Sequence, residues 1–130
     1  MMGRPHWRTQ GSGRQGMGMM RLSAAPIKVR AGLVSLRVVN VGALTHEVVV
    51  LPLPVGQAAG ERPTGSDGKA DEAGSLGEAS RSCGAGAGNG ITPSAIAWTT
   101  LPMQPGRYEM ICNFPCHYAA SMYTELDVTR

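Results

Sequence analysis

The sequence predicts an all-β sandwich built from a single domain. Short segments rich in apolar and β-branched residues are separated by glycine and proline, which is typical of strands joined by turns. No segment shows a convincing long helical pattern, and 18 of the 130 residues are glycine. With 42% hydrophobic and 16% charged residues, the chain can form one packed core.

The expected strands follow one another along the chain. Residues 33–40 are β-branched and partly alternating, and Gly42 then marks a turn. Residues 46–51 form a second apolar run that ends at Pro52, since proline cannot donate to a sheet ladder. Three more strands are expected at 95–101 (bounded by Pro93 and Pro102), 107–112 and 122–128, the last with Tyr123, Leu126 and Val128 in the core.

A long glycine-rich connection separates the second expected strand from the third. Residues 56–90 contain ten glycines and few large apolar residues. Loops of this length inside a compact domain are usually functional or mobile. Asp71 to Ser80 is a candidate short helix, because alanine, glutamate and leucine recur there. We therefore expect an insertion loop at 56–90, with 71–80 only as a candidate for a short helix.

The start of the chain differs in charge from the rest. Residues 1–30 carry six basic and no acidic side chains, whereas residues 31–130 carry six basic and nine acidic ones. A basic segment can attract nucleic acid or an acidic membrane surface. The aromatic interleaving used by proteins that stack on single strands is missing, so nucleic acid is not an expected ligand. We expect a disordered basic tail at 1–19 and one domain at 20–130.

Methionines at the end of this tail allow two interpretations. Met17, Met19 and Met20 would suit a weak copper(I) site, because thioethers are soft ligands. Alternatively, Met19 and residues 21–23 begin an edge strand. We favour the strand.

Neither a membrane span nor a secretory signal is visible. The longest apolar run, residues 48–55, has about the length of a strand and contains two prolines, whereas a membrane helix needs roughly 20 apolar residues. The basic opening residues are not followed by the apolar stretch of a signal peptide. The chain is thus either cytosolic or the product of leader removal.

The clearest chemistry lies between the fourth and fifth expected strands. Residues 112–122 place the thiol of Cys112, the imidazole of His117 and the thioether of Met122 within eleven residues. A second imidazole, His46, begins the second strand, and the remaining histidine, His6, lies in the tail. Copper that alternates between Cu(I) and Cu(II) suits one thiolate and two imidazoles in a plane with a weak axial methionine.

This pattern resembles the cupredoxins, the small blue copper proteins. The Cys-x4-His-x4-Met spacing of residues 112–122 is most similar to the rusticyanin and sulfocyanin branch, as is the Asn40-x-Gly42 turn before the first histidine. The resemblance covers about residues 20–130, weakly in 56–90. It implies a Greek-key β-sandwich that transfers single electrons and is not an enzyme. It implies one copper ion, bound by His46, Cys112, His117 and Met122.

The resemblance also implies how such a protein would work. The loop histidine of the family, here His117, lies at an apolar rim and passes the electron to redox partners that dock transiently. The candidates for this rim are Leu44, Phe114, Pro115, Tyr118, Ala119 and Ala120. We expect Glu47 to face solvent, and an amide of Asn113 or of the Asn40 turn to donate to the Cys112 sulfur. We expect a monomer in the periplasm or elsewhere outside the cytoplasm.

One position departs from the family pattern. The family usually has glycine just before the second histidine, where this chain has Cys116. A Cβ is unfavourable there if the backbone needs a positive φ. The extra thiol is inert, competes for the metal, or forms a disulfide with Cys83 in an oxidising compartment.

Other functions remain as alternatives. Cys112 and Cys116 resemble the bridging thiolates of the binuclear copper domain of terminal oxidases, although that family places its histidine several residues later. A structural zinc site from His46, Cys112, Cys116 and His117 is chemically allowed but crowded. An extracytoplasmic copper-delivery protein is the second function class. A Ser/His/Asp hydrolase is not supported, because no nucleophile elbow is present. Cysteine-nucleophile chemistry would need Cys112 or Cys116 paired with His117 and an orienting group, and no such group is evident.

Overall fold

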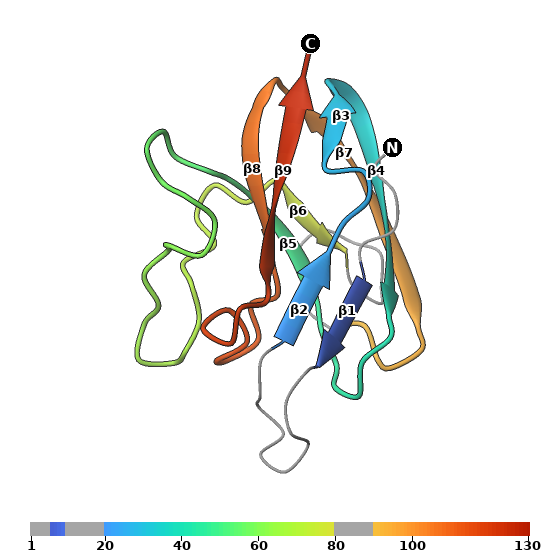
Figure 1. Ribbon diagram of the computed structural model, residues 1–130, viewed down its shortest axis with the longest axis vertical. Helices are drawn as coiled ribbons and strands as arrows, with labels where there is room; N and C mark the ends of the chain where they lie inside the picture. Colours follow the sequence, from blue (N-terminus) through green and yellow to red (C-terminus); the bar gives the residue numbers. More distant parts are fainter. Residues whose placement is uncertain (1–5, 10–19, 80–89) are drawn as a thin grey trace.

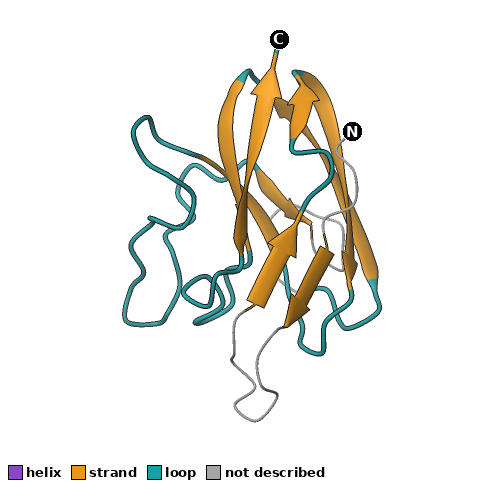
Figure 2. Ribbon diagram, viewed as in Figure 1, coloured by secondary structure: helices purple, strands orange, loops and turns teal. Residues whose placement is uncertain are grey.

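Two β-sheets form the protein in the computed structural model, which describes residues 6–9, 20–79 and 90–130 (Figure 1). The first sheet has the order β2 (Met20–Ser23), β1 (His6–Thr9), β4 (Gly32–Asn40), β7 (Ile96–Met103). The second has the order β3 (Lys28–Arg30), β9 (Tyr123–Thr129), β8 (Gly106–Ile111), β5 (Val48–Pro52), β6 (Gly77–Ala79). The described residues contain only strands and loops (Figure 2), so the prediction of an all-β sandwich is confirmed.

The core lies between the two sheets. Side chains of β4 and β7 alternate between buried and exposed along both strands, because successive residues point to opposite faces. The buried positions of β4, among them Leu36 and Val38, face Met110 and Leu126 of the second sheet within one apolar cluster. Burying such side chains is the main favourable term of folding, roughly 25 cal/mol for each Å² of apolar surface.

The second sheet is also covered on its outer face. Val48 and Val50 of β5 point into the main core, whereas Val49 and Leu51 belong to a separate apolar cluster. That cluster includes Ala70 from the long connection after β5. β5 is therefore apolar at every position from 48 to 51, because the insertion shields the face that solvent would otherwise reach.

Two expected boundaries were wrong. Pro102 lies inside β7 and opposite Leu33, and does not end the strand at residue 101. β7 is the outermost strand of its sheet, so a residue without an amide proton is tolerated there. His46 precedes β5 and joins Ile91 in an isolated bridge instead of beginning the strand.

The insertion and the start of the chain also differ from expectation. The candidate helix at 71–80 is not formed in its described part, where turns lead into the short strand β6, which pairs with β5. In the tail, residues 6–9 form β1, which pairs with both β2 and β4, while the bounds of tail and domain stay predictions. Met20 begins β2, as the edge-strand interpretation requires. Met17, Met19 and Cys83 lie outside the described residues, and so does any disulfide of Cys83.

None of the described residues forms a helix with the length and hydropathy of a membrane span.

Candidate metal centre

The first histidine is held by a turn that the side chain of Asn40 stabilises. This side chain donates to the carbonyls of Leu44 and Ile91, both at 2.7 Å, and its oxygen accepts from the Gly42 amide at 2.9 Å. The backbone of His46 then pairs with that of Ile91. The Asn40-x-Gly42 motif thus has a physical use, because it closes the turn and directs the following histidine into the sandwich.

The second histidine lies on the loop of residues 112–122, which we call the ligand loop. It connects β8 to β9 at the lower end of the sandwich in Figure 1. The backbone of Met122 accepts from the Cys112 amide at 3.1 Å and donates to the His117 carbonyl at 3.2 Å. These contacts close the loop, so residues at its start, middle and end are held close together.

Three of the four expected ligands converge on one point. The Cys112 Sγ lies 3.6 Å from the Nδ1 atom of His46 and 3.3 Å from that of His117, and the two Nδ1 atoms lie 3.2 Å apart. All three side chains are buried. Met122 is fully buried at the end of the same loop. The candidate ligand groups of His46 and Cys112, 66 residues apart in the sequence, therefore meet inside the domain.

The dimensions of this triangle suit a metal ion. The centre of a triangle with these sides lies about 2.0 Å from each corner, which matches metal–imidazole bonds of about 2.0 Å and is shorter than metal–thiolate bonds of about 2.3 Å. A small outward movement of the sulfur is enough to accommodate an ion. A set of two imidazoles and one thiolate is borderline to soft, which favours copper or zinc over magnesium or calcium.

Burial keeps all three groups neutral when no metal is bound. It raises the pKa of the Cys112 thiol to about 12 and, together with the nearby His117 ring, lowers the pKa of His46 to about 4. It also lowers the pKa of His117. Metal binding must therefore expel the thiol proton, while the imidazoles are available down to acidic pH.

The sulfur accepts a hydrogen bond from the backbone. The Glu47 amide donates to the Cys112 Sγ at 3.4 Å, and this contact favours the thiolate. The expected donors were the amide of Asn113 or one from the Asn40 turn. The Asn113 side chain instead bonds the Ala70 backbone at 2.8 Å in both directions.

The expectation that Glu47 faces solvent was wrong. Its side chain is buried, and the charged groups that act on it, Glu78, Glu72 and Lys69, all belong to the insertion. Burial, followed by the carboxylates of Glu78 and Glu72, raises the pKa of Glu47 to about 7, although Lys69 opposes the shift. A carboxyl group that titrates near neutral pH thus lies directly beside the first histidine.

We expect Glu47→Gln to stabilise the copper-free protein in a pH-dependent way. Between the ordinary pKa of glutamate and about 7, folded protein binds a proton that unfolded protein has released, so stability falls as pH rises. The variant, being neutral throughout, should exceed wild type by about 2 to 3 kcal/mol at pH 8 and by almost nothing at pH 4.5. Denaturant unfolding at both pH values measures this difference. Glu61→Gln, at an exposed site, is the control. A gain that does not grow with pH would contradict the expectation.

Cys116 lies beside the site without joining it. It is exposed and does not belong to the cluster of His46, Cys112 and His117. Among the described residues, neither the four-ligand zinc site nor a two-thiolate site is therefore formed. Its φ of 69° lies in the left-handed region that favours glycine.

We expect Cys116→Gly to raise the stability of the copper-free protein by about 0.5 to 1 kcal/mol. The left-handed conformation costs a residue with a Cβ about 1 to 2 kcal/mol, and the greater freedom of glycine when unfolded offsets part of the gain. Cys116→Ala is the matched control, since it removes the thiol and keeps the Cβ. Equal stability of the two variants in thermal unfolding would show that the backbone is not strained there.

The expected apolar rim is formed only in part. Pro115 and Ala119 are exposed, and the Phe114 ring meets the His117 ring edge-on at a centroid distance of 5.8 Å. Tyr118 was wrongly placed on the rim. It is 3% exposed, because its side chain points to the outer face of the second sheet and joins the cluster of Leu51 and Ala70.

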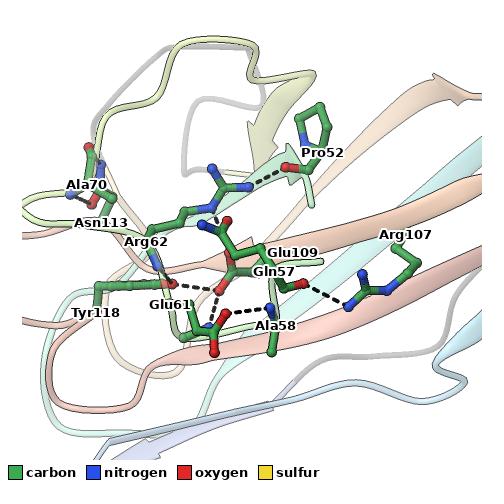
Figure 3. A network of polar contacts seen from close by, with 11 residues as sticks. Pro52, Gln57, Ala58, Glu61, Arg62, Ala70, Arg107, Glu109, Asn113 and Tyr118 are labelled. Atoms are coloured by element: carbon green, nitrogen blue, oxygen red, sulfur yellow. Dashed lines mark hydrogen bonds and ion pairs between the residues drawn. The ribbon is translucent and has the colours of Figure 1, made fainter. Parts of the chain in front are cut away.

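A group of polar side chains beneath the insertion was not predicted from the sequence (Figure 3). Glu109 of β8 is fully buried and contacts Arg62 and Tyr118. Its neighbours along the strand, Tyr108 and Met110, face the main core, so alternation alone places Glu109 in solvent. Only the path of the insertion buries it, and no local pattern reveals that path.

Comparison with known proteins shows a likeness in structure alone. No family model matches the chain, and no curated protein sequence matches it significantly. An auracyanin from Roseiflexus castenholzii superposes with a TM-score of 0.58 at 16% identity, covering 98% of this chain and 97% of that one. Auracyanin A from Chloroflexus aurantiacus gives 0.59 at 16%, covering 97% and 98%. The chain has the cupredoxin fold. Reduced rusticyanin gives a TM-score of 0.57 at 13% identity, covering 97% of this chain and 78% of that one.

A shared fold does not by itself assign a function. In this cupredoxin-like domain, the function has to be argued from the three convergent side chains.

Proposed function

We propose that the chain binds one copper ion, which His46, Cys112 and His117 would hold with Met122 as a fourth, weaker ligand, and that it carries single electrons between redox proteins. The observation that carries the proposal is the buried triangle of one sulfur and two nitrogens, with sides of 3.2 to 3.6 Å. One thiolate with two imidazoles is the donor set of blue copper sites. Among the similar structures, auracyanin A is a blue copper protein and rusticyanin is a copper protein.

Each residue has a distinct part in this proposal. Copper, when bound, supplies a couple that gains or loses one electron. Cys112 and His46 are fully buried and hold their ligand atoms on the rigid sandwich. His117, with 8% of its surface exposed, is the ligand closest to solvent and therefore the proposed path for the electron. The apolar surroundings exclude water from the site. This limits how far solvent and ligands must rearrange when the copper ion gains or loses an electron.

Partners would dock over His117. Exposed Pro115 and Ala119 lie on the same loop, and partly exposed Leu44 comes from the opposite turn. Small apolar surfaces of this kind suit short-lived redox complexes. A location outside the cytoplasm and a monomeric state accompany this proposal.

The test is addition of copper(II) to the metal-free protein. An intense visible absorption should reach its maximum at one equivalent and should disappear and return on reduction and reoxidation. A protein that stays colourless, binds copper(I) and yields it rapidly to a chelator would instead be a delivery protein, which would overturn the electron-carrier proposal.

A further inference from the structure

The insertion after β5 lies against the ligand loop as well as against the sheet. In Figure 1 the insertion lies to the left of β8, and its lower end reaches the level of the ligand loop. Ala70 and Tyr118 belong to the same apolar cluster, so the two loops pack together and are not merely adjacent. The contacts between them are specific, and most involve residues 60–70.

A buried carboxylate organises the first set of contacts (Figure 3). Glu109 accepts from the Gly60 amide at 2.7 Å, from the Arg62 Nε at 2.6 Å and from the Tyr118 hydroxyl at 2.8 Å. The Arg62 amide in turn donates to the Tyr118 hydroxyl at 3.0 Å, and its guanidinium also donates to the carbonyl of Pro52. A fully buried charge needs such partners, because an unpaired one is strongly destabilising.

Two further contacts continue along the loops. The Cys116 amide donates to the Gly68 carbonyl at 2.8 Å, and the Asn113 side chain bonds both backbone groups of Ala70 at 2.8 Å. The approach at Gly68 is close, since an added Cβ would lie 2.9 Å from the nitrogen and the sulfur of Cys116. Residues 62, 68 and 70 thus hold residues 118, 116 and 113 in register.

We propose that residues 60–70 together with Glu109 form a clasp that holds the ligand loop in its metal-binding shape before copper arrives. Tyr118 is the positioning residue, because it follows His117 directly and its hydroxyl reaches the buried ion pair. None of the clasp contacts uses the ligand atoms, so they persist with or without metal. The role of the clasp in copper binding rests on the proposed function. The contacts that form the clasp are a property of the metal-free chain.

The decisive variant is Tyr118→Phe, which removes the hydroxyl and preserves the ring. In the copper-free protein, amide hydrogen exchange over residues 114–121 should become about 3- to 10-fold faster, the equivalent of one net hydrogen bond. In the copper-loaded protein, release of copper(II) to a chelator should accelerate by a similar factor. Tyr108→Phe is the matched control, because its hydroxyl donates to the Gln104 carbonyl in the turn between β7 and β8, away from the ligand loop. It should change neither rate.

A second pair of variants tests the clasp by substitutions in the insertion. Gly68→Ala presses a methyl group onto Cys116, whereas Gly74→Ala meets no atom within 4 Å at a similar positive φ. Only the first should speed exchange over the ligand loop. Unchanged exchange in both Tyr118→Phe and Gly68→Ala, or equal changes in their controls, would overturn the clasp. If the chain failed to bind copper, the proposed function would be overturned. Hydrogen exchange in the copper-free protein would still decide whether the clasp exists.

Discussion

Arg62→Met is expected to destabilise the copper-free protein by about 3 to 5 kcal/mol, the cost of leaving a buried carboxylate without its partner. The Arg62 side chain is 13% exposed and Glu109 is fully buried, so water cannot replace the guanidinium. The Gly60 amide and the Tyr118 hydroxyl would remain as donors, but neither carries a positive charge. Denaturant unfolding, followed by circular dichroism, measures the loss.

The chain offers a matched control for this variant. Arg107 pairs with Glu125 at 3.1 Å, on exposed side chains of the adjacent strands β8 and β9. Exposed pairs contribute little, because water screens both partners. Arg107→Met should therefore cost much less than Arg62→Met. Similar losses in the two variants would mean that the buried pair does not stabilise the attachment of the insertion.

The second large effect is expected from Cys112→Ser. The hydroxyl is a harder and far weaker copper ligand than a thiolate, and it cannot produce the charge-transfer absorption of a copper–sulfur bond. The variant should stay colourless with copper(II). Its affinity should fall by about 100-fold or more, beyond the 10- to 100-fold that loss of an outer hydrogen-bond partner causes. Visible spectroscopy and competition with a chelator measure both.

Cys116→Ser is the control for this loss. The side chain is exposed and lies outside the ligand cluster, so colour and affinity should stay close to those of wild type. Circular dichroism must show that both variants fold. If Cys116→Ser loses the colour and Cys112→Ser keeps it, the assignment of the metal ligand is wrong.

Much of the fold follows from local patterns. The alternation along β4 and β7 comes from burial of one face only, which a period of two residues reveals directly. The apolar run of β5 is equally visible in the sequence, but its burial on both faces cannot be predicted from the run. It is buried on both faces because the insertion covers the outer one, and nothing within the run itself indicates that cover.

The candidate site was predictable for a similar reason. Three of its side chains lie on one short loop, where their spacing is visible, and the fourth follows a turn with its own motif at Asn40. The structure brings His46, Cys112 and His117 together, and buries Met122 at the end of the loop. The role of Met122 as axial ligand stays a prediction.

What could not be predicted depends on contacts between distant segments. Arg62 and Glu109 are 47 residues apart, and neither carries a local signal of burial. Glu47 looks like an exposed residue beside a candidate ligand, yet its side chain is buried near charged groups of the insertion. β1 has no apolar period and is a strand because β2 and β4 offer it partners on both sides. In each case tertiary structure overrides the local pattern.

X-ray absorption at the copper edge tests the central claim most directly. The protein loaded with one equivalent of copper(II) should show one short sulfur ligand and two imidazole nitrogens, since Cys112, His46 and His117 offer those atoms to a single ion. The sulfur signal should vanish in Cys112→Ser and persist in Cys116→Ser. A copper ion surrounded only by nitrogen and oxygen in the wild-type protein would contradict the account.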